Sequence, residues 1–285
     1  MKIPRNQPCV CGSGIRFKHC CGNLATAPAD YDKKKWSRRD IYDKHGWLSH
    51  EAKKNGLLRR FAEYPRLPVT GDTNFELPPG IMAIQNFLSN ETCAKWGKYI
   101  QAQASSSLGV QDTNFYEETG EKRTVFHAAR VTETVDLGPL KKEVLGEVVR
   151  AYKDVIVPHF QLPLDTIEPP MALCYGPGGR YDCHADSEYW DNQNFVWSRS
   201  MNRDLSVLIY LSEEFEGGAL FFPNFNLRIR PTAGMMVAFP SDHRYIHAAE
   251  PLTSGSRIAI VSWAAAKTPK LFDPMSRLRP SRLRY

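Results

Sequence analysis

The chain has 285 residues, of which 42% are hydrophobic and 11% aromatic, and its formal net charge is +6. This length allows one large domain or one domain with an appendage, and the apolar fraction excludes a disordered chain. No apolar run approaches the length that spans a bilayer, and the N-terminal residues lack the apolar stretch of a secretory signal. We therefore expect a cytoplasmic protein whose cysteines are reduced and bind metal more readily than they form disulfides.

The basic charge is concentrated at the two ends. Residues 1–70 carry 15 Lys and Arg against 6 Asp and Glu, and residues 271–285 carry 4 Arg against 1 Asp. Basic ends can contact nucleic acid, a ribosome or anionic lipid. They can equally be solvated without any partner, so charge alone assigns no function to them.

Four of the seven cysteines fall within the stretch PCVCGSGIRFKHCCG: Cys9, Cys11, Cys20 and Cys21. Four thiolates around a short turn suit tetrahedral zinc, and so small a segment has no core without a metal. His19 is a weaker alternative, because the four cysteines already complete the shell. The stretch closely resembles the SEC-C motif, a small zinc-binding module. That resemblance implies a structural zinc in residues 1–24 and a docking contact with the ribosome or another protein.

The following elements are expected in chain order. Residues 25–75 read as a basic linker, and a short strand followed by a helix begins near residue 80, with Ser89 or Asn90 as the cap. A second helix is expected over residues 138–158, and only short β-rich runs separated by turns come after it. Helices followed by strands predict an α+β fold: a double-stranded β-helix (jelly roll) with helices on one face, over residues 76–270. Residues 271–285 form a basic tail.

The stretch YDCHADSEYW places His184 and Asp186 one residue apart. On a β-strand, the two side chains would project from the same face. By themselves they could form an ordinary His–Asp hydrogen bond. Farther along the chain stands His247, followed ten residues later by Arg257. Two histidines and one carboxylate form the facial triad that holds Fe(II), and an arginine on a neighbouring strand can bind a carboxylate through two hydrogen bonds.

Three segments carry a family resemblance: CYGPGGRYDCHAD, LSVLIYLSEEFEGGALFFP and PTAGMMVAFPSDHRYIHAAEPLTSGSRIAIVSW. They look like the 2-oxoglutarate- and Fe(II)-dependent dioxygenases of the prolyl 4-hydroxylase type, over about residues 80–266. The resemblance implies the following roles: iron ligands at His184, Asp186 and His247; binding of the 5-carboxylate of 2-oxoglutarate at Arg257 and Tyr210; and lining of the cosubstrate pocket at Tyr175. It also implies a Gly-Gly turn at Gly217 and Gly218.

A rival for the third iron ligand is His243. The distances from His247 to Pro251 and Arg257 match the family pattern, so the resemblance favours His247. Residues 187–204 are polar, aromatic and long for a hairpin connection. They suit a loop that covers the substrate, and an ordinary surface loop is an equal alternative.

The resemblance also implies the reaction and its participants. With Fe(II), 2-oxoglutarate, O₂ and ascorbate, the enzyme would hydroxylate a protein or peptide, at proline, and release succinate and CO₂. One alternative is a dioxygenase of the same fold that acts on nucleic acid or a small molecule, and another is a non-catalytic binding module. Base-demethylating relatives carry a second Arg six residues after the cosubstrate Arg, where this chain has Trp263. That residue favours a prolyl hydroxylase, and the intact triad disfavours a binding module.

Overall fold

The computed structural model describes residues 76–267, apart from 79, 113, 114, 116, 117, 122, 161, 192–195 and 226. It also describes the isolated residues 6, 16, 281 and 282. The predicted zinc cysteines, the basic linker of residues 25–75 and most of the basic tail lie outside the described residues. No helix in the part of the chain that the structure describes is long and apolar enough to cross a bilayer.

The larger of two main sheets has eight antiparallel strands. Along its path the order is β2 (Met82–Ile84), β17 (Met236–Pro240), β13 (Leu205–Tyr210), β20 (Arg257–Ala266), β9 (Met171–Tyr175), β7 (Glu133–Val135) and β3 (Ser105–Ser107). The eighth strand, β8 (Leu164–Ile167), pairs with the far end of β20. Strand β20 is central because it pairs with three others, and nine of its ten residues are buried.

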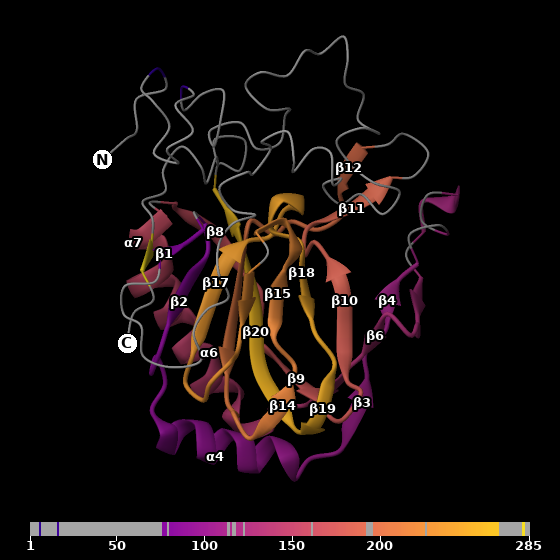
Figure 1. Cartoon of the computed structure of the whole chain (residues 1–285). Helices are drawn as coiled ribbons and strands as arrows, with labels where there is room; N and C mark the ends of the chain where they lie inside the picture. The colour runs from indigo at the N-terminus through magenta and orange to yellow at the C-terminus, as the bar shows by residue number, and fades with distance from the viewer. Residues whose placement is uncertain are drawn as a thin grey trace.

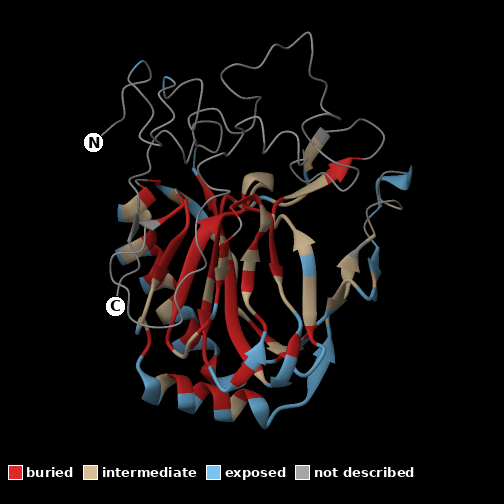
Figure 2. Ribbon diagram, in the orientation of Figure 1, coloured by how far each residue is buried: buried red, intermediate tan, exposed pale blue. Residues whose placement is uncertain are grey.

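The smaller main sheet has five strands, in the order β16 (Leu227–Ile229), β15 (Leu220–Phe222), β18 (His247–Ala249), β10 (Arg180–His184) and β6 (Arg130–Val131). It faces the larger sheet, since the rings of Phe222 on β15 and Phe239 on β17 pack edge to face with centroids 5.0 Å apart. Two facing antiparallel sheets with short connections form the predicted double-stranded β-helix. Buried residues fill the centre of both sheets (Figure 2).

Four further strand pairs lie outside the two main sheets. They are β1 (Glu76–Leu77) with β21 (Ser281–Arg282), β4 (Val110–Gln111) with β5 (Thr124–Val125), β11 (Glu188–Asp191) with β12 (Val196–Arg199), and β14 (Phe215–Gly217) with β19 (Leu252–Gly255). The segment 187–204 therefore contains the hairpin β11–β12, where the sequence suggested an irregular loop. Figure 1 shows this hairpin beyond the end of the sheets at which β10 terminates.

Helices cover the outer face of the larger sheet, as predicted (Figure 1). Helix α4 (Asn90–Gln101) begins where expected, because the Ser89 Oγ accepts a hydrogen bond from the Thr92 backbone N–H at 3.2 Å. It buries Trp96 and Ile100 against the core. The second helical segment docks on the sheet through Tyr152, which is fully buried and donates its hydroxyl to the Ser262 carbonyl at 3.0 Å.

The second helical segment is not the single helix that the sequence predicted. It consists of a 3-10 turn (Gly138–Leu140), α6 (Lys141–Arg150), a π-helical stretch (Ala151–Ile156) and α7 (Val157–Phe160). Pro158 lacks the N–H that would continue the α-helical pattern. The preceding Val157 N–H donates to the Tyr152 carbonyl, which is the wider spacing of a π-turn. Shorter 3-10 turns occur at Pro223–Phe225 and His243–Tyr245.

Candidate active site and metal centre

The structure brings together His184, Asp186 and His247, one ligand atom of each lying within 4.8 Å of the others. His184 ends β10 and His247 begins β18, and the two residues are Cα partners in the antiparallel pair. The Asp186 carboxylate lies between them, with Oδ1 3.4 Å from His184 Nε2 and Oδ2 3.7 Å from His247 Nε2.

The expected reason for this cluster was partly wrong. His184 and Asp186 were expected on one face of a single strand, but β10 ends at His184. Asp186 lies in the bend that follows, and the pairing of β10 with β18 shifts register between Tyr181 and His184. The carboxylate therefore reaches the two imidazoles through a turn and not through the pleat of a strand.

Both histidines present Nε2 to the centre of this cluster. The Nδ1 atom of His184 lies 2.8 Å from the Asp182 carbonyl, and that of His247 lies 3.1 Å from the Tyr245 carbonyl. A carbonyl oxygen only accepts hydrogen bonds, so each Nδ1 donates, and the lone pair of the neutral ring is on Nε2. In both cases the carbonyl belongs to the residue two positions earlier, so the local backbone orients each ring.

Burial and charge give His247 and Asp186 the protonation states that a metal requires. Burial lowers the pKa of His247 to about 4, and the nearby Asp186 carboxylate offsets only part of that effect. The His247 imidazole is therefore neutral at pH 7. Burial opposes the ionisation of Asp186, but the two histidines and a hydrogen bond from Ser206 outweigh burial and hold its pKa well below the usual range. Two imidazole nitrogens and one carboxylate are a donor set that suits Fe(II).

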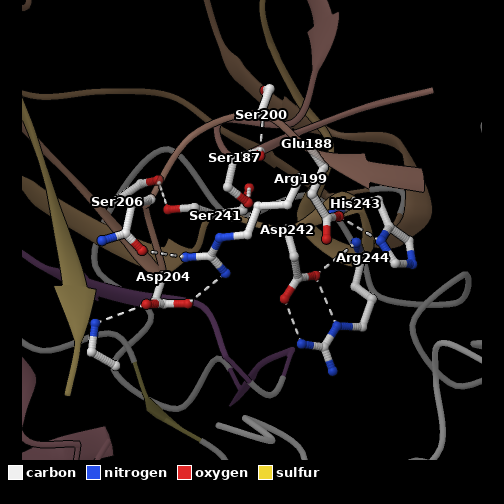
Figure 3. A network of polar contacts seen from close by, with 12 residues as sticks. Ser187, Glu188, Arg199, Ser200, Asp204, Ser206, Ser241, Asp242, His243 and Arg244 are labelled. Atoms are coloured by element: carbon white, nitrogen blue, oxygen red, sulfur yellow. Dashed lines mark hydrogen bonds and ion pairs between the residues drawn. The ribbon is translucent and has the colours of Figure 1, made fainter. Parts of the chain in front are cut away.

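His243, the rival ligand, lies outside the cluster. Its Nδ1 atom is 2.6 Å from Glu188 Oε2, and its backbone N–H donates to the same oxygen at 2.8 Å. Its ring stacks on Trp197, with centroids 5.2 Å apart and planes at 10°. His243 thus links the 3-10 turn before His247 to the hairpin β11–β12 (Figure 3).

Arg257 is a cation buried behind the His–Asp–His cluster, with 2% of its surface exposed. Its Nη1 donates to the Gly218 carbonyl, and its guanidinium carbon lies 4.1 Å from the centre of the Tyr175 ring. Among the described residues, the Arg257 Nε has no hydrogen-bond partner. A buried guanidinium with a donor still to satisfy suits an anionic ligand such as a carboxylate.

The structure places the two predicted tyrosines with this arginine. Tyr175 is the Cα partner of Arg257 across β9 and β20. Tyr210 ends β13, is 1% exposed and lines the same pocket as Arg257. Burial raises the pKa of Tyr210 and the Arg257 charge lowers it less, so its hydroxyl is protonated and can donate a hydrogen bond.

Two glycines shape the wall that contacts Arg257. Gly217 and Gly218 have φ angles of +74° and +63°, in the left-handed region that favours glycine. A Cβ on Gly218 would come within 2.7 Å of Leu252 Cδ1. The Gly-Gly turn predicted from the sequence is therefore present, and it directs the Gly218 carbonyl to the arginine.

A pocket of about 560 Å³ between the two sheets contains the cluster and Arg257. Five aromatic side chains line this pocket, and of these the sequence pointed only to Trp263: Tyr181, Tyr189, Trp190, Trp197 and Trp263. The Tyr181 ring stacks on His184, with centroids 3.6 Å apart and planes at 19°. Tyr181 was detectable from the sequence, because it lies on the same strand only three residues before His184.

An ion pair in the lining of the pocket was not predicted either. Arg203 donates from Nε and Nη2 to Glu168 at 2.6 and 2.7 Å, and its Nη1 donates to the Asp186 carbonyl at 3.4 Å. The Arg203 guanidinium also lies over the Trp263 ring, 3.6 Å from its centre. Residues distant in sequence form this pair, so no local pattern indicated it.

Comparisons with known proteins agree with this geometry. Residues 170–265 match the model of the 2OG-Fe(II) oxygenase superfamily, and residues 5–23 match the SEC-C motif. A putative prolyl 4-hydroxylase of Acanthamoeba polyphaga mimivirus is 32% identical over 136 residues, which is 44% of this chain and 52% of the relative. A PKHD-type hydroxylase of Hyphomonas neptunium is 31% identical over 146 residues, which is 48% of this chain and 61% of the relative.

The chain thus spans about half to three fifths of the length of these two relatives. Among solved structures, the viral collagen prolyl hydroxylase of Paramecium Bursaria Chlorella virus-1, in complex with 2OG, has a TM-score of 0.49 and 20% identity. That similarity covers 69% of this chain and 100% of the viral chain.

Proposed function

We propose that this chain is a 2-oxoglutarate- and Fe(II)-dependent dioxygenase that hydroxylates a protein at proline, on the basis that its residues 170–265 match the model of the 2OG-Fe(II) oxygenase superfamily. The observation that carries this proposal is the convergence of His184, Asp186 and His247 in one pocket with the buried Arg257. Iron, 2-oxoglutarate and O₂ supply the oxidising chemistry that converts a C–H bond to C–OH, with release of succinate and CO₂. The protein binds, orients and shields the reactants.

The two His Nε2 atoms and the Asp186 carboxylate would hold Fe(II). Their side chains are turned inward by backbone carbonyls and by Ser206, so little rearrangement is needed when the ion binds. Aromatic rings line the pocket, and an apolar substrate that packs on them would exclude water from the site.

Arg257 would bind the distal carboxylate of 2-oxoglutarate, with the Tyr210 hydroxyl as a second donor and Tyr175 as the side wall. The support is that the guanidinium is buried, that its Nε has no partner among the described residues, and that an anion would satisfy it. A charge-assisted hydrogen bond in such a site is shorter and stronger than a neutral one.

A protein substrate with proline as its target is proposed because two relatives are named as prolyl 4-hydroxylase and PKHD-type hydroxylase. Aromatic side chains line the pocket, among them Tyr189, Trp190 and Trp197, and such rings suit contact with a proline ring. Ascorbate is proposed as the accessory reductant. Nucleic acid and small molecules are the alternative substrates, and the incubation experiment described below distinguishes them from protein.

The four cysteines Cys9, Cys11, Cys20 and Cys21 lie within the segment that matches the SEC-C motif. We propose that they hold one structural zinc and that this module docks on a target protein or on the ribosome, with the basic ends able to contact nucleic acid. A cytoplasmic location is part of the same proposal, and cell fractionation with detection of the native protein tests it.

The decisive experiment incubates the full-length protein with Fe(II), 2-oxoglutarate, ascorbate and proteins of a host lysate. We expect succinate formation that depends on 2-oxoglutarate, and mass spectrometry should find an added oxygen on proline. Oxygen found on a nucleobase or a metabolite, with none on protein, would show that the enzyme acts on one of the alternative substrates. No succinate from a metal-loaded, folded protein would overturn the proposal.

A further inference from the structure

The Oδ2 atom of the Asp186 carboxylate accepts a hydrogen bond from a buried serine. Ser206 Oγ donates a hydrogen bond to Asp186 Oδ2 at 2.6 Å, and Ser206 is fully buried. Side chains on a strand alternate between faces, so Ser206 shares the pocket side of β13 with Leu208 and Tyr210. In the apolar strand LSVLIY, a serine on that side is the polar exception.

A second serine determines which way the Ser206 hydroxyl points. Ser241 Oγ lies 2.7 Å from Ser206 Oγ, and Ser241 is 1% exposed. The single hydrogen of Ser206 is used on Asp186, so the Ser241 hydroxyl donates to Ser206. Both hydroxyl groups therefore point toward the carboxylate, in the order Ser241, Ser206, Asp186.

The backbone around Ser241 is held at both of its polar groups. Its N–H donates to the Asp204 carbonyl at 3.1 Å, and its carbonyl accepts the N–H and the hydroxyl of Ser187, each at 3.0 Å. Ser187 directly follows Asp186, so the bend that carries the carboxylate is tied to the same point (Figure 3). The serine pair consequently has little freedom to move away from Asp186.

We infer that Ser206, supported by Ser241, is a positioning residue for the proposed iron-binding carboxylate: it holds Oδ2 and turns Oδ1 toward the site. The terminal torsion of an aspartate side chain has a broad, shallow preference, so an unrestrained carboxylate would rotate. Oδ1 is the oxygen that lies 3.4 Å from His184 Nε2. This inference rests on the proposed function, because it takes the bound ion to be Fe(II).

The expected effect is on metal binding before any turnover. Loss of an outer partner of a metal ligand typically weakens metal affinity about 10-fold to 100-fold. We expect Ser206→Ala to raise the dissociation constant for the ion about 10-fold. Ser206→Thr keeps the hydroxyl and suits a strand, so it should restore most of the affinity. Ser241→Ala leaves Ser206 in place and should also raise the dissociation constant, but by a smaller factor.

Mn(II) is a suitable probe for the full-length protein. It prefers oxygen and nitrogen donors, so it reports on the His–Asp–His site and avoids the N-terminal cysteines. Electron paramagnetic resonance of free Mn(II) during a titration gives the dissociation constant without any turnover. Ser262→Ala is the matched control, because Ser262 is also fully buried on a neighbouring strand but donates to the Glu168 carbonyl. Circular dichroism and thermal melting establish that each variant is folded.

The outcomes separate this inference from the proposed function. Weaker Mn(II) binding by the two alanine variants, with recovery in Ser206→Thr and no change in Ser262→Ala, supports it. Wild-type affinity in folded Ser206→Ala, or equal loss in Ser206→Thr and Ser206→Ala, overturns it and leaves the proposed function intact. If Ser206→Ala does not fold, wild-type affinity in Ser241→Ala overturns the role of the pair. Wild-type protein that binds no Mn(II) removes the proposed function and this inference together.

Discussion

His184 and His247 face each other across a single antiparallel strand pair, as Cα partners whose ring centroids are 4.4 Å apart. One residue ends β10 and the other begins β18, so the pair stands at the rim of the smaller sheet. Sheet register, which is set by the whole row of backbone hydrogen bonds, thus determines the distance between the two imidazoles. Asp186 completes the cluster from the bend beyond β10.

The first prediction tests the ligand assignment. His184→Ala, Asp186→Ala and His247→Ala should each abolish succinate formation, because each removes one of three metal donors, while the protein stays folded. His243→Ala should retain turnover, since His243 contacts Glu188 and Trp197 instead of the cluster. An inactive His243 variant together with an active His247 variant would reverse the assignment.

The second prediction concerns 2-oxoglutarate. Arg257→Ala should weaken its binding by roughly 2–5 kcal/mol, the usual cost of removing one partner of a buried charge pair. Tyr210→Phe should cost about 1 kcal/mol, as for one neutral hydrogen bond. Isothermal titration with 2-oxoglutarate in the presence of Mn(II) measures both. Equal affinity in the wild type and in Arg257→Ala would show that the cosubstrate binds elsewhere.

The third prediction separates backbone strain from steric clash in the Gly-Gly turn. Gly217 has φ +74°, and a Cβ there would press on the Pro251 carbonyl oxygen. Gly120 has nearly the same φ, +73°, with nothing within 4 Å of the added Cβ. Both alanine variants should pay about 1–2 kcal/mol for the left-handed backbone. Only Gly217→Ala should add a clash and lower the melting temperature further, and only it should weaken 2-oxoglutarate binding.

The fourth prediction concerns the hairpin β11–β12. His243→Ala removes the side-chain hydrogen bond to Glu188 and the stacking on Trp197 and leaves the backbone N–H bond in place, so the hairpin should open more readily. A loss of about 1 kcal/mol corresponds to roughly fivefold faster amide exchange. Hydrogen–deuterium exchange over residues 188–199 measures it. Arg228→Ala, which removes an ion pair of 2.7 Å with Glu250, is the control and should leave that exchange unchanged.

The fifth prediction concerns the N-terminal cysteines. Replacing Cys20 and Cys21 by serine in the full-length protein should remove one equivalent of zinc, because a structural site needs its complete shell. Turnover of 2-oxoglutarate without substrate should stay unchanged, while capture of the target protein should weaken, since one of two linked contacts is lost. Metal analysis and co-precipitation measure these effects. Unchanged zinc content would refute the four-cysteine site.

Much of the fold was predictable because its signals are local. Ser89 begins α4 through a hydrogen bond to a residue three positions away, and the apolar runs that predict β9, β13, β17 and β20 each form a strand. The hairpin β11–β12 and the edge strand β3 were missed. The first lies in a polar and aromatic segment, and the second consists of three exposed serines, so neither shows the alternation that marks a half-buried strand.

The amino-acid order was enough to identify the residues available for the chemistry: two histidines, one aspartate and one arginine at spacings that resemble those of a known family. This was possible because residue types and their spacings are read directly from the chain and need no knowledge of the fold. Three contacts became visible only in the folded chain: His243 with Glu188, Arg203 with the Asp186 carbonyl, and Ser206 with the Asp186 carboxylate. These contacts join strands distant in sequence, and strand pairing is set by the packing of both sheets together and not by any local pattern.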